Sequence, residues 1–251
     1  MPMLKIPDGE IYYEEFGSGF PVLAFAPGSL RSQAAYWRQA PADPTKTPPW
    51  MDATAELSSQ FRVIAMDQRN AGRSRARLRI SDAWQSYADD HLALLDHLKI
   101  ERCHTIGGCI GASFCLTLCE RVPQRIVSAA LLQPIGRTAE NVALLRQEFE
   151  EIWKPAMRTA NPEIDEAALL GFGERMFGPD FVYSVSREFV AGCHIPMLVM
   201  PGSDLAHPSS IADELVRLAP RSEYVRRWKG DARAYGALCV RDFFLRNTPR
   251  P

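Results

Sequence analysis

Residues 105–113 constrain the fold of this chain more than any other stretch. They read Thr-Ile-Gly-Gly-Cys-Ile-Gly-Ala-Ser, after an apolar approach and before a run from Ser113 to Arg121 that reads as a helix. Gly107 and Gly111 flank Cys109 at the two places where a β-carbon would crowd a tight turn. The pattern predicts a strand that turns sharply into a helix, with the Cys109 thiol at the apex. This arrangement is called a nucleophile elbow.

Strand-like and helix-like segments alternate along the rest of the core. Apolar runs typical of buried parallel strands alternate with periodic segments typical of helices. The alternation predicts an α/β fold, with a mostly parallel twisted sheet covered by helices on both faces. We expect a hairpin over 4–16, further strands at 21–25, 61–66, 126–133, 195–202 and 222–228, and helices at 51–59, 82–98, 209–219 and 236–246, with Ser209 or Ser210 as an N-cap.

The pattern of apolar and polar residues changes between residues 137 and 192. Helical segments are expected at 139–153, 165–176 and 182–189, with prolines between them and no strand. We interpret 137–192 as a small helical cap inserted into a core made of residues 1–136 and 193–251. Some of its aromatic side chains are expected to line an apolar pocket.

Composition narrows the function classes. A formal net charge of -1 gives no reason to expect a nucleic acid or an anionic membrane as partner. No apolar run is long enough to span a membrane, and the N-terminus has no signal-peptide core. Six cysteines without a C-x-x-C pair, in a chain of 251 residues, suggest neither a disulfide framework nor zinc. We expect a cytoplasmic protein that binds a small molecule and needs neither a metal nor an organic cofactor. The sequence is compatible with either a monomer or a homodimer.

Four motifs resemble those of the α/β-hydrolase fold superfamily. They occur in the same order and with similar spacing, and the resemblance extends over nearly the whole chain. Residues 27–29, Pro-Gly-Ser, lie where that family usually has His-Gly-x. Residues 67–74 match its D-x-R-G-x-G-x-S loop, with Asn70 in place of a glycine. The elbow is the third motif. Residues 201–208 match the G-x-x-D-x-x-x-P segment that carries the family's acid.

The resemblance implies a role for each matching residue. Cys109 would be the nucleophile, and the backbone N–H groups of Ile110 and Ser29, the latter following Gly28, would form the oxyanion hole. Asp204 would orient an imidazole.

The thiol is the first departure from the family pattern. Dienelactone hydrolase and polyhydroxyalkanoate synthase are similar in placing a cysteine at the elbow. A thiol ionises far more easily than a hydroxyl, so it needs less help from a base. It also forms a thioester, which suits acyl transfer as well as hydrolysis.

The missing histidine is the second departure. In the family it follows the last strand, but residues 229–233 read Lys-Gly-Asp-Ala-Arg. His207 is the last of the five histidines and stands three residues after Asp204, so it is our candidate for a relocated base. The alternative is a polar residue at a helix start. The remaining histidines are interpreted as structural or surface residues: His91, His97, His104 and His194.

These observations predict a hydrolase of a small carboxylic ester, lactone or thioester, acting through Cys109 and an acyl-enzyme. An acyltransferase that uses the same thioester is one alternative. A non-catalytic ligand-binding protein is another, favoured by the missing C-terminal histidine, and the fold also supports lyases and isomerases. The arginines at 73, 75, 77 and 79 form either a solvated face or a contact for an acidic substrate group.

Overall fold

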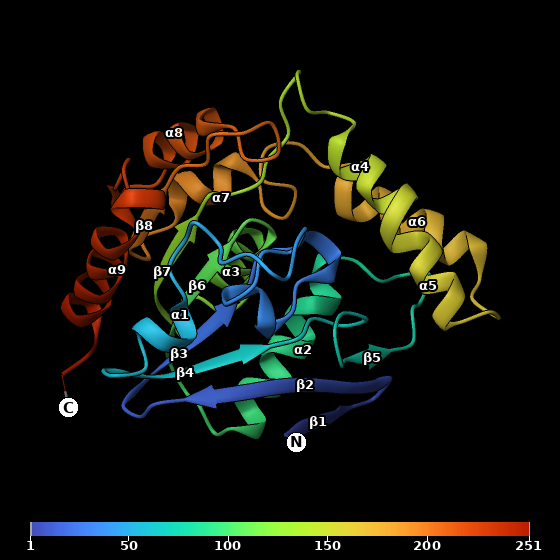
Figure 1. Cartoon of the computed structure of the whole chain (residues 1–251), viewed down its shortest axis with the longest axis horizontal. Helices are drawn as coiled ribbons and strands as arrows, with labels where there is room; N and C mark the ends of the chain where they lie inside the picture. Colours follow the sequence, from blue (N-terminus) through green and yellow to red (C-terminus); the bar gives the residue numbers. More distant parts are fainter. Residues whose placement is uncertain (1, 251) are drawn as a thin grey trace.

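A nine-stranded sheet forms the centre of the molecule (Figure 1), in a computed structural model that describes residues 2–250. The strands are β1 (Met3–Ile6), β2 (Gly9–Phe16), β3 (Phe20–Phe25), β4 (Phe61–Met66), β5 (Arg75–Ala76), β6 (Cys103–Gly108), β7 (Ile126–Leu132), β8 (Met197–Met200) and β9 (Ser222–Tyr224). Their order is β1-β2-β4-β3-β6-β7-β8-β9, and β5 pairs with β2. The pairs from β4 to β9 are parallel, and the others are antiparallel. The predicted α/β fold is confirmed.

Helices cover both faces of the sheet, as strands that are apolar on both sides require. The helices of the core are α1 (Ala53–Glu56), α2 (Trp84–His97), α3 (Ile110–Arg121), α8 (Ser209–Leu218) and α9 (Arg233–Asn247). One face packs against α2, α3 and α8 through Leu94, Phe114 and Leu215. The opposite face packs against α1 and α9, with Phe243 and Phe244 fully buried.

An arm of helices projects from one side of the core, between β7 and β8 (Figure 1). It consists of α4 (Leu144–Glu148), a π-helical stretch (Phe149–Trp153), α5 (Lys154–Ala160) and α6 (Glu166–Phe177). The stacked rings of Trp153 and Phe172, with centroids 5.0 Å apart, join its two layers. The Trp84 indole N–H donates to the Met176 carbonyl at 3.2 Å, which ties the arm to the start of α2.

The helices of the cap segment differ from the predicted ones. Pro155 does not break the first helix, because the π-helical stretch before it absorbs the interrupted hydrogen bonds. The expected helix at 182–189 is wrong. Tyr183 has a φ of 65°, and α7 (Arg187–Gly192) begins only after Ser186, whose hydroxyl accepts from the Phe189 N–H at 3.1 Å.

Several boundaries in the core also differ from the prediction. Helix α3 begins at Ile110 rather than Ser113, because Cys109 itself ends the turn. Pro208, not Ser209 or Ser210, is the residue before α8. Helix α1 is one turn long, and β9 stops at Tyr224, while the short strand β5 was not predicted.

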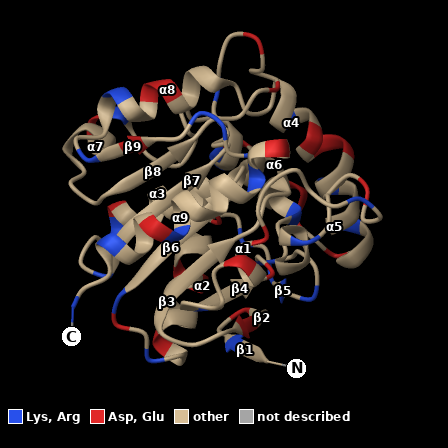
Figure 2. Cartoon of the chain, turned by 60° about the vertical axis from the view of Figure 1, so that its left-hand side comes forward, with Lys and Arg blue, Asp and Glu red and all other residues tan. Residues whose placement is uncertain are grey.

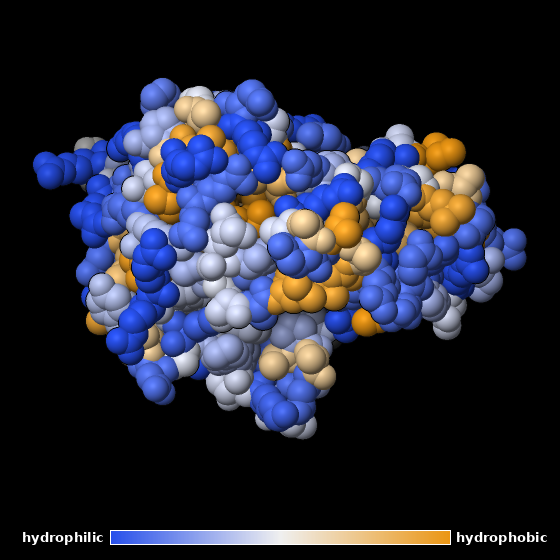
Figure 3. All heavy atoms as spheres, turned by 90° about the horizontal axis from the view of Figure 1, so that it is seen from above, coloured by the Kyte–Doolittle hydropathy of each residue, from blue (hydrophilic) through white to orange (hydrophobic). Residues whose placement is uncertain are grey.

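Residues of both signs of charge are spread over the core and the arm (Figure 2). Seen from above, the apolar regions of the surface form separate patches between hydrophilic side chains (Figure 3), and the exposed apolar residues include Val142, Leu170 and Leu205. Over residues 2–250, no helix combines the length and the apolar character needed to cross a membrane.

Candidate active site

The elbow places Cys109 on a strained turn between β6 and α3. Its φ of 58° and ψ of -121° lie outside the regions that residues with a β-carbon favour. A β-carbon on Gly107 would lie 2.0 Å from the Gly111 carbonyl oxygen, and one on Gly111 would lie 2.3 Å from the Phe25 carbonyl oxygen. Both glycines are therefore required by the backbone, which gives the G-x-C-x-G pattern its physical reason.

A second loop brings Asp204 and His207 together beyond the carboxyl end of β8. The Asp204 carboxylate lies 2.7 Å from Nδ1 of His207 and also accepts the His207 backbone N–H at 2.9 Å. A β-carbon on Gly202 would lie 2.2 Å from His207, so the loop closes only around a glycine. These two contacts from one carboxylate fix both the backbone and the ring of His207. Nε2 is then the ring nitrogen that has no contact with Asp204.

The Cys109 thiol and the His207 imidazole interact. Burial opposes ionisation of Cys109, but the positive charge of His207, its hydrogen bond and two backbone amides hold the pKa of the thiol below its ordinary value. Burial also lowers the pKa of His207, but the thiolate and Asp204 outweigh it and raise that pKa. Within residues 2–250, the buried Nε2 of His207 meets no acceptor at ordinary hydrogen-bond geometry, so charge is the stronger link between the imidazole and the thiol. The arrangement favours a thiolate–imidazolium pair.

The backbone amides of Gly28 and Ile110 help to lower the pKa of the Cys109 thiol. The Ile110 amide is one of the two predicted oxyanion donors. Ser29, the other, is buried at the start of a short 3₁₀ helix, η1 (Ser29–Arg31), with a φ of 52°. Its role as a donor stays a prediction, and the amide of the neighbouring Gly28 is the one that acts on the pKa of the thiol.

Lys229 and Gln133 also belong to this site, although the sequence gave them no role. Lys229 lies in the loop where the family's histidine was expected, and its ammonium donates to the Gln133 side chain at 3.2 Å. Burial lowers the pKa of Lys229, and its charge in turn helps to lower the pKa of Asp204 to about 2, after the larger effect of His207. The signal was the position of Lys229 itself, in the loop between the last strand and the last helix.

The remaining histidines lie away from the thiol. His91 is buried on α2 and lies 2.8 Å from the Gln68 side chain, and His104 lies 2.8 Å from the Ser128 hydroxyl inside the sheet. His97 lies on α2 beside Tyr13, and His194 is exposed before β8. In the part of the chain that the structure describes, no three His, Cys, Asp or Glu side chains gather as a metal site would need.

The elbow, the parallel sheet and the acid loop occur together in known proteins. A family model described as alpha/beta hydrolase fold matches residues 34–176 of this chain. The chain belongs to this family. Solved structures agree in fold: the enol-lactonase from Burkholderia xenovorans LB400 superposes with a TM-score of 0.67 at 22% identity, covering 97% of this chain and 100% of that one. A meta-cleavage product hydrolase from Pseudomonas fluorescens IP01 gives 0.68 at 20% identity, covering 96% of each chain.

Curated relatives match shorter stretches. An uncharacterized carboxylesterase, nap, of Bacillus subtilis is 32% identical over 186 residues, which is 61% of this chain and 57% of the relative. A putative carbamate hydrolase, RutD, of Variovorax paradoxus is 31% identical over 122 residues, or 49% of this chain and 41% of the relative. Each of these matches spans less than two thirds of the relative's own length.

Proposed function

We propose that this protein is a hydrolase of small carboxylic esters, lactones or thioesters, with Cys109 as nucleophile, His207 as acid and base, and Asp204 as the group that orients His207. The observation that carries the proposal is the interaction of the buried thiol with an imidazole whose other nitrogen lies 2.7 Å from a carboxylate. The names of the relatives, which include a carboxylesterase and an enol-lactonase, support the same class of reaction.

The reaction follows from the charges at the site. The Cys109 thiolate attacks the acyl carbon, and backbone N–H groups at Ile110 and at Gly28 or Ser29 stabilise the oxyanion. Loss of one such donor costs about 3 kcal/mol of transition-state stabilisation in related chemistry. The bond to the leaving group breaks, and that group takes the proton from Nε2 of His207. Water then attacks the thioester, gives its proton to His207, and releases the acid and the thiolate.

Acyl transfer is the second candidate. One relative is named as the dihydrolipoyllysine-residue acetyltransferase component of the acetoin cleaving system of Pseudomonas putida, and it is 33% identical over 87 residues. The same acyl-thioester would serve it, with a thiol or alcohol taking the place of water.

Turnover of 4-nitrophenyl acetate tests the proposal. We expect a burst of nitrophenol, an acetyl group on Cys109 by mass spectrometry, and no burst from Cys109→Ser. Added thiol acceptors that raise the steady-state rate and yield acetylated acceptor would favour acyl transfer. A wild-type protein that gives no burst and whose Cys109 reacts with iodoacetamide as slowly as the buried Cys115 would refute the proposal and favour a binding protein.

A further inference from the structure

A small cavity lies between the core and the cap segment, beside the loop that follows β3. Its volume is about 210 Å³. The polar part of its lining comes from Arg31, Asn70, Arg75 and Asn161, and α5 with Trp153 supplies an apolar wall. No acidic residue lines it. Two guanidinium groups facing an apolar wall suit a small ligand that joins a negative charge to a short carbon chain.

The charge of Arg75 is not neutralised. Its guanidinium donates to the carbonyl oxygens of Gly72 and Ser74, at 2.8 and 2.6 Å, and within residues 2–250 no carboxylate lies at ion-pair distance. The nearby Arg73 differs in this respect, since its guanidinium pairs with Glu14 and Asp67. Carbonyl contacts hold Arg75 in place and leave its full positive charge for a ligand.

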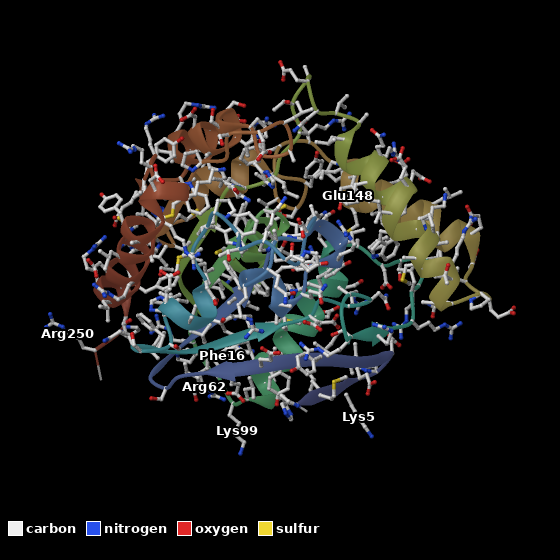
Figure 4. The ribbon with its side chains drawn as sticks, in the orientation of Figure 1. Lys5, Phe16, Arg62, Lys99, Glu148 and Arg250 are labelled. Carbon is white, nitrogen blue, oxygen red and sulfur yellow. The ribbon has the colours of Figure 1, made fainter. Side chains whose placement is uncertain are left out.

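Arg31 and Trp153, which both line the cavity, also carry buried donors without partners among the described residues. Arg31 donates through Nη2 to Glu148 of α4 at 3.2 Å, but its Nε is buried and has no partner in the described chain. The indole N–H of Trp153, a residue that is 4% exposed, is likewise buried without a partner. Figure 4 labels Glu148 on the side of α4 that faces the core. Buried donors left unpaired are costly, and an anionic ligand would satisfy them.

The cavity is close to the elbow. The Arg31 N–H donates to the Gly28 carbonyl at 3.0 Å, which closes one turn, and the Gly28 amide helps to lower the pKa of the Cys109 thiol. One turn of backbone therefore joins the lining of the cavity to the elbow. A wider groove of about 830 Å³ shares Asn70, Arg75 and Asn161 with the cavity.

We propose that this cavity binds a carboxylate of the substrate, so that the preferred substrates are esters or thioesters whose acyl chain ends in a carboxylate. Arg31 and Arg75 bind the carboxylate, the Trp153 N–H donates to it, and the apolar wall contacts the methylene chain. This inference rests on the proposed hydrolase function and specifies its substrate class.

A pair of matched esters tests the substrate class. Mono-4-nitrophenyl adipate and 4-nitrophenyl hexanoate share the leaving group and the chain length and differ in the terminal carboxylate. We expect kcat/KM to favour the adipate ester by about tenfold or more, as charge-assisted hydrogen bonds allow. Arg31→Gln and Arg75→Gln should each lower this ratio about tenfold. The control Arg102→Gln removes an exposed charge next to the amino end of the central strand β6, at the other end of that strand from the elbow, and should leave the ratio unchanged.

Glu148→Gln provides a test with the opposite sign. The Glu148 carboxylate competes with the expected ligand for the Arg31 guanidinium. Its removal should therefore lower KM for the adipate ester several-fold and leave KM for the hexanoate ester unchanged. If the Arg31–Glu148 pair only holds the cap in place, both esters would instead be hydrolysed more slowly. That outcome would overturn the role given to Arg31.

Failure of this inference can be told apart from failure of the hydrolase proposal. If the wild type hydrolyses both esters at equal rates and the arginine variants change nothing, the carboxylate site is wrong and the hydrolase proposal stands. If the wild type hydrolyses neither ester, calorimetric binding of glutarate replaces turnover. Binding by the wild type that is lost in Arg31→Gln and Arg75→Gln supports the carboxylate site, and absence of binding by the wild type overturns it.

Discussion

Replacing His207 by alanine should convert Cys109 from an activated thiol into an inert buried one. In the folded protein two opposing effects act on the Cys109 pKa: burial raises it, while the charge of His207, its hydrogen bond and the amides of Gly28 and Ile110 lower it. The variant removes the largest of the lowering effects and leaves burial in place. The thiol pKa must therefore rise.

Cys115 on α3 sets the size of the change. It is fully buried, whereas Cys109 is 8% exposed, and burial raises the pKa of the Cys115 thiol to about 12. A thiol that moves from the usual ~8.5 to such a value loses about three thousandfold in thiolate fraction at neutral pH. The amides of Gly28 and Ile110 remain in the variant, so this figure is an upper limit.

The rate of iodoacetamide labelling against pH measures this effect directly. Peptide mass spectrometry follows Cys109 and Cys115 in the same sample, so Cys115 serves as an internal reference for accessibility. We expect the wild-type Cys109 to label with an apparent pKa below ~8.5 and the His207→Ala thiol to label as slowly as Cys115. An unchanged labelling profile in His207→Ala would refute the thiolate–imidazolium pair.

Three further predictions follow from the same geometry. Burial lowers the pKa of His207, but the Cys109 thiolate and Asp204 raise it to about 10, and we expect this pKa to set an alkaline limit to turnover. Asp204→Asn should move this limit to lower pH in a profile of kcat/KM against pH. A limit that does not move would contradict the assignment. Gly107→Ala would place a β-carbon 2.0 Å from the Gly111 carbonyl oxygen and should cost about 2 kcal/mol or more in urea unfolding, as overpacking does. Lys229→Met should lower turnover by less than about tenfold, whereas loss of a general base costs about a hundredfold or more, so a loss of that size would make Lys229 the base.

The sheet could be predicted because its signals are local. A continuous apolar run such as residues 63–66 leaves no polar face, so it had to become a buried strand, and it lies within β4. The cap segment was harder to predict. Its helix boundaries depend on a π-helical stretch before Pro155 and on the left-handed backbone at Tyr183, and neither has a pattern in the sequence.

The site could be predicted only where one motif contains the geometry. The glycines at 107 and 111 define the elbow, and the three-residue spacing of Asp204 and His207 allowed their contact, which the structure places at 2.7 Å. Contacts between distant segments could not be read in this way. Lys229 meets Gln133 across 96 positions of the chain, and Arg31 meets Glu148 across 117, so the sequence assigned neither pair.

The choice of cysteine and the position of the histidine are linked. His207 and Asp204 come from one short loop after β8, whereas the family's histidine comes from a separate loop, which here carries Lys229. A serine hydroxyl at the elbow would need an imidazole that is free to take its proton at the moment of attack. Here burial opposes the charged imidazole, and the Cys109 thiolate is the largest cause that raises its pKa. In the mechanism that we propose, the proton therefore resides on His207 because Cys109 carries a thiol rather than a hydroxyl. An imidazole held in this way is poised to protonate a leaving group rather than to activate a hydroxyl, so the relocated histidine fits a cysteine and not a serine.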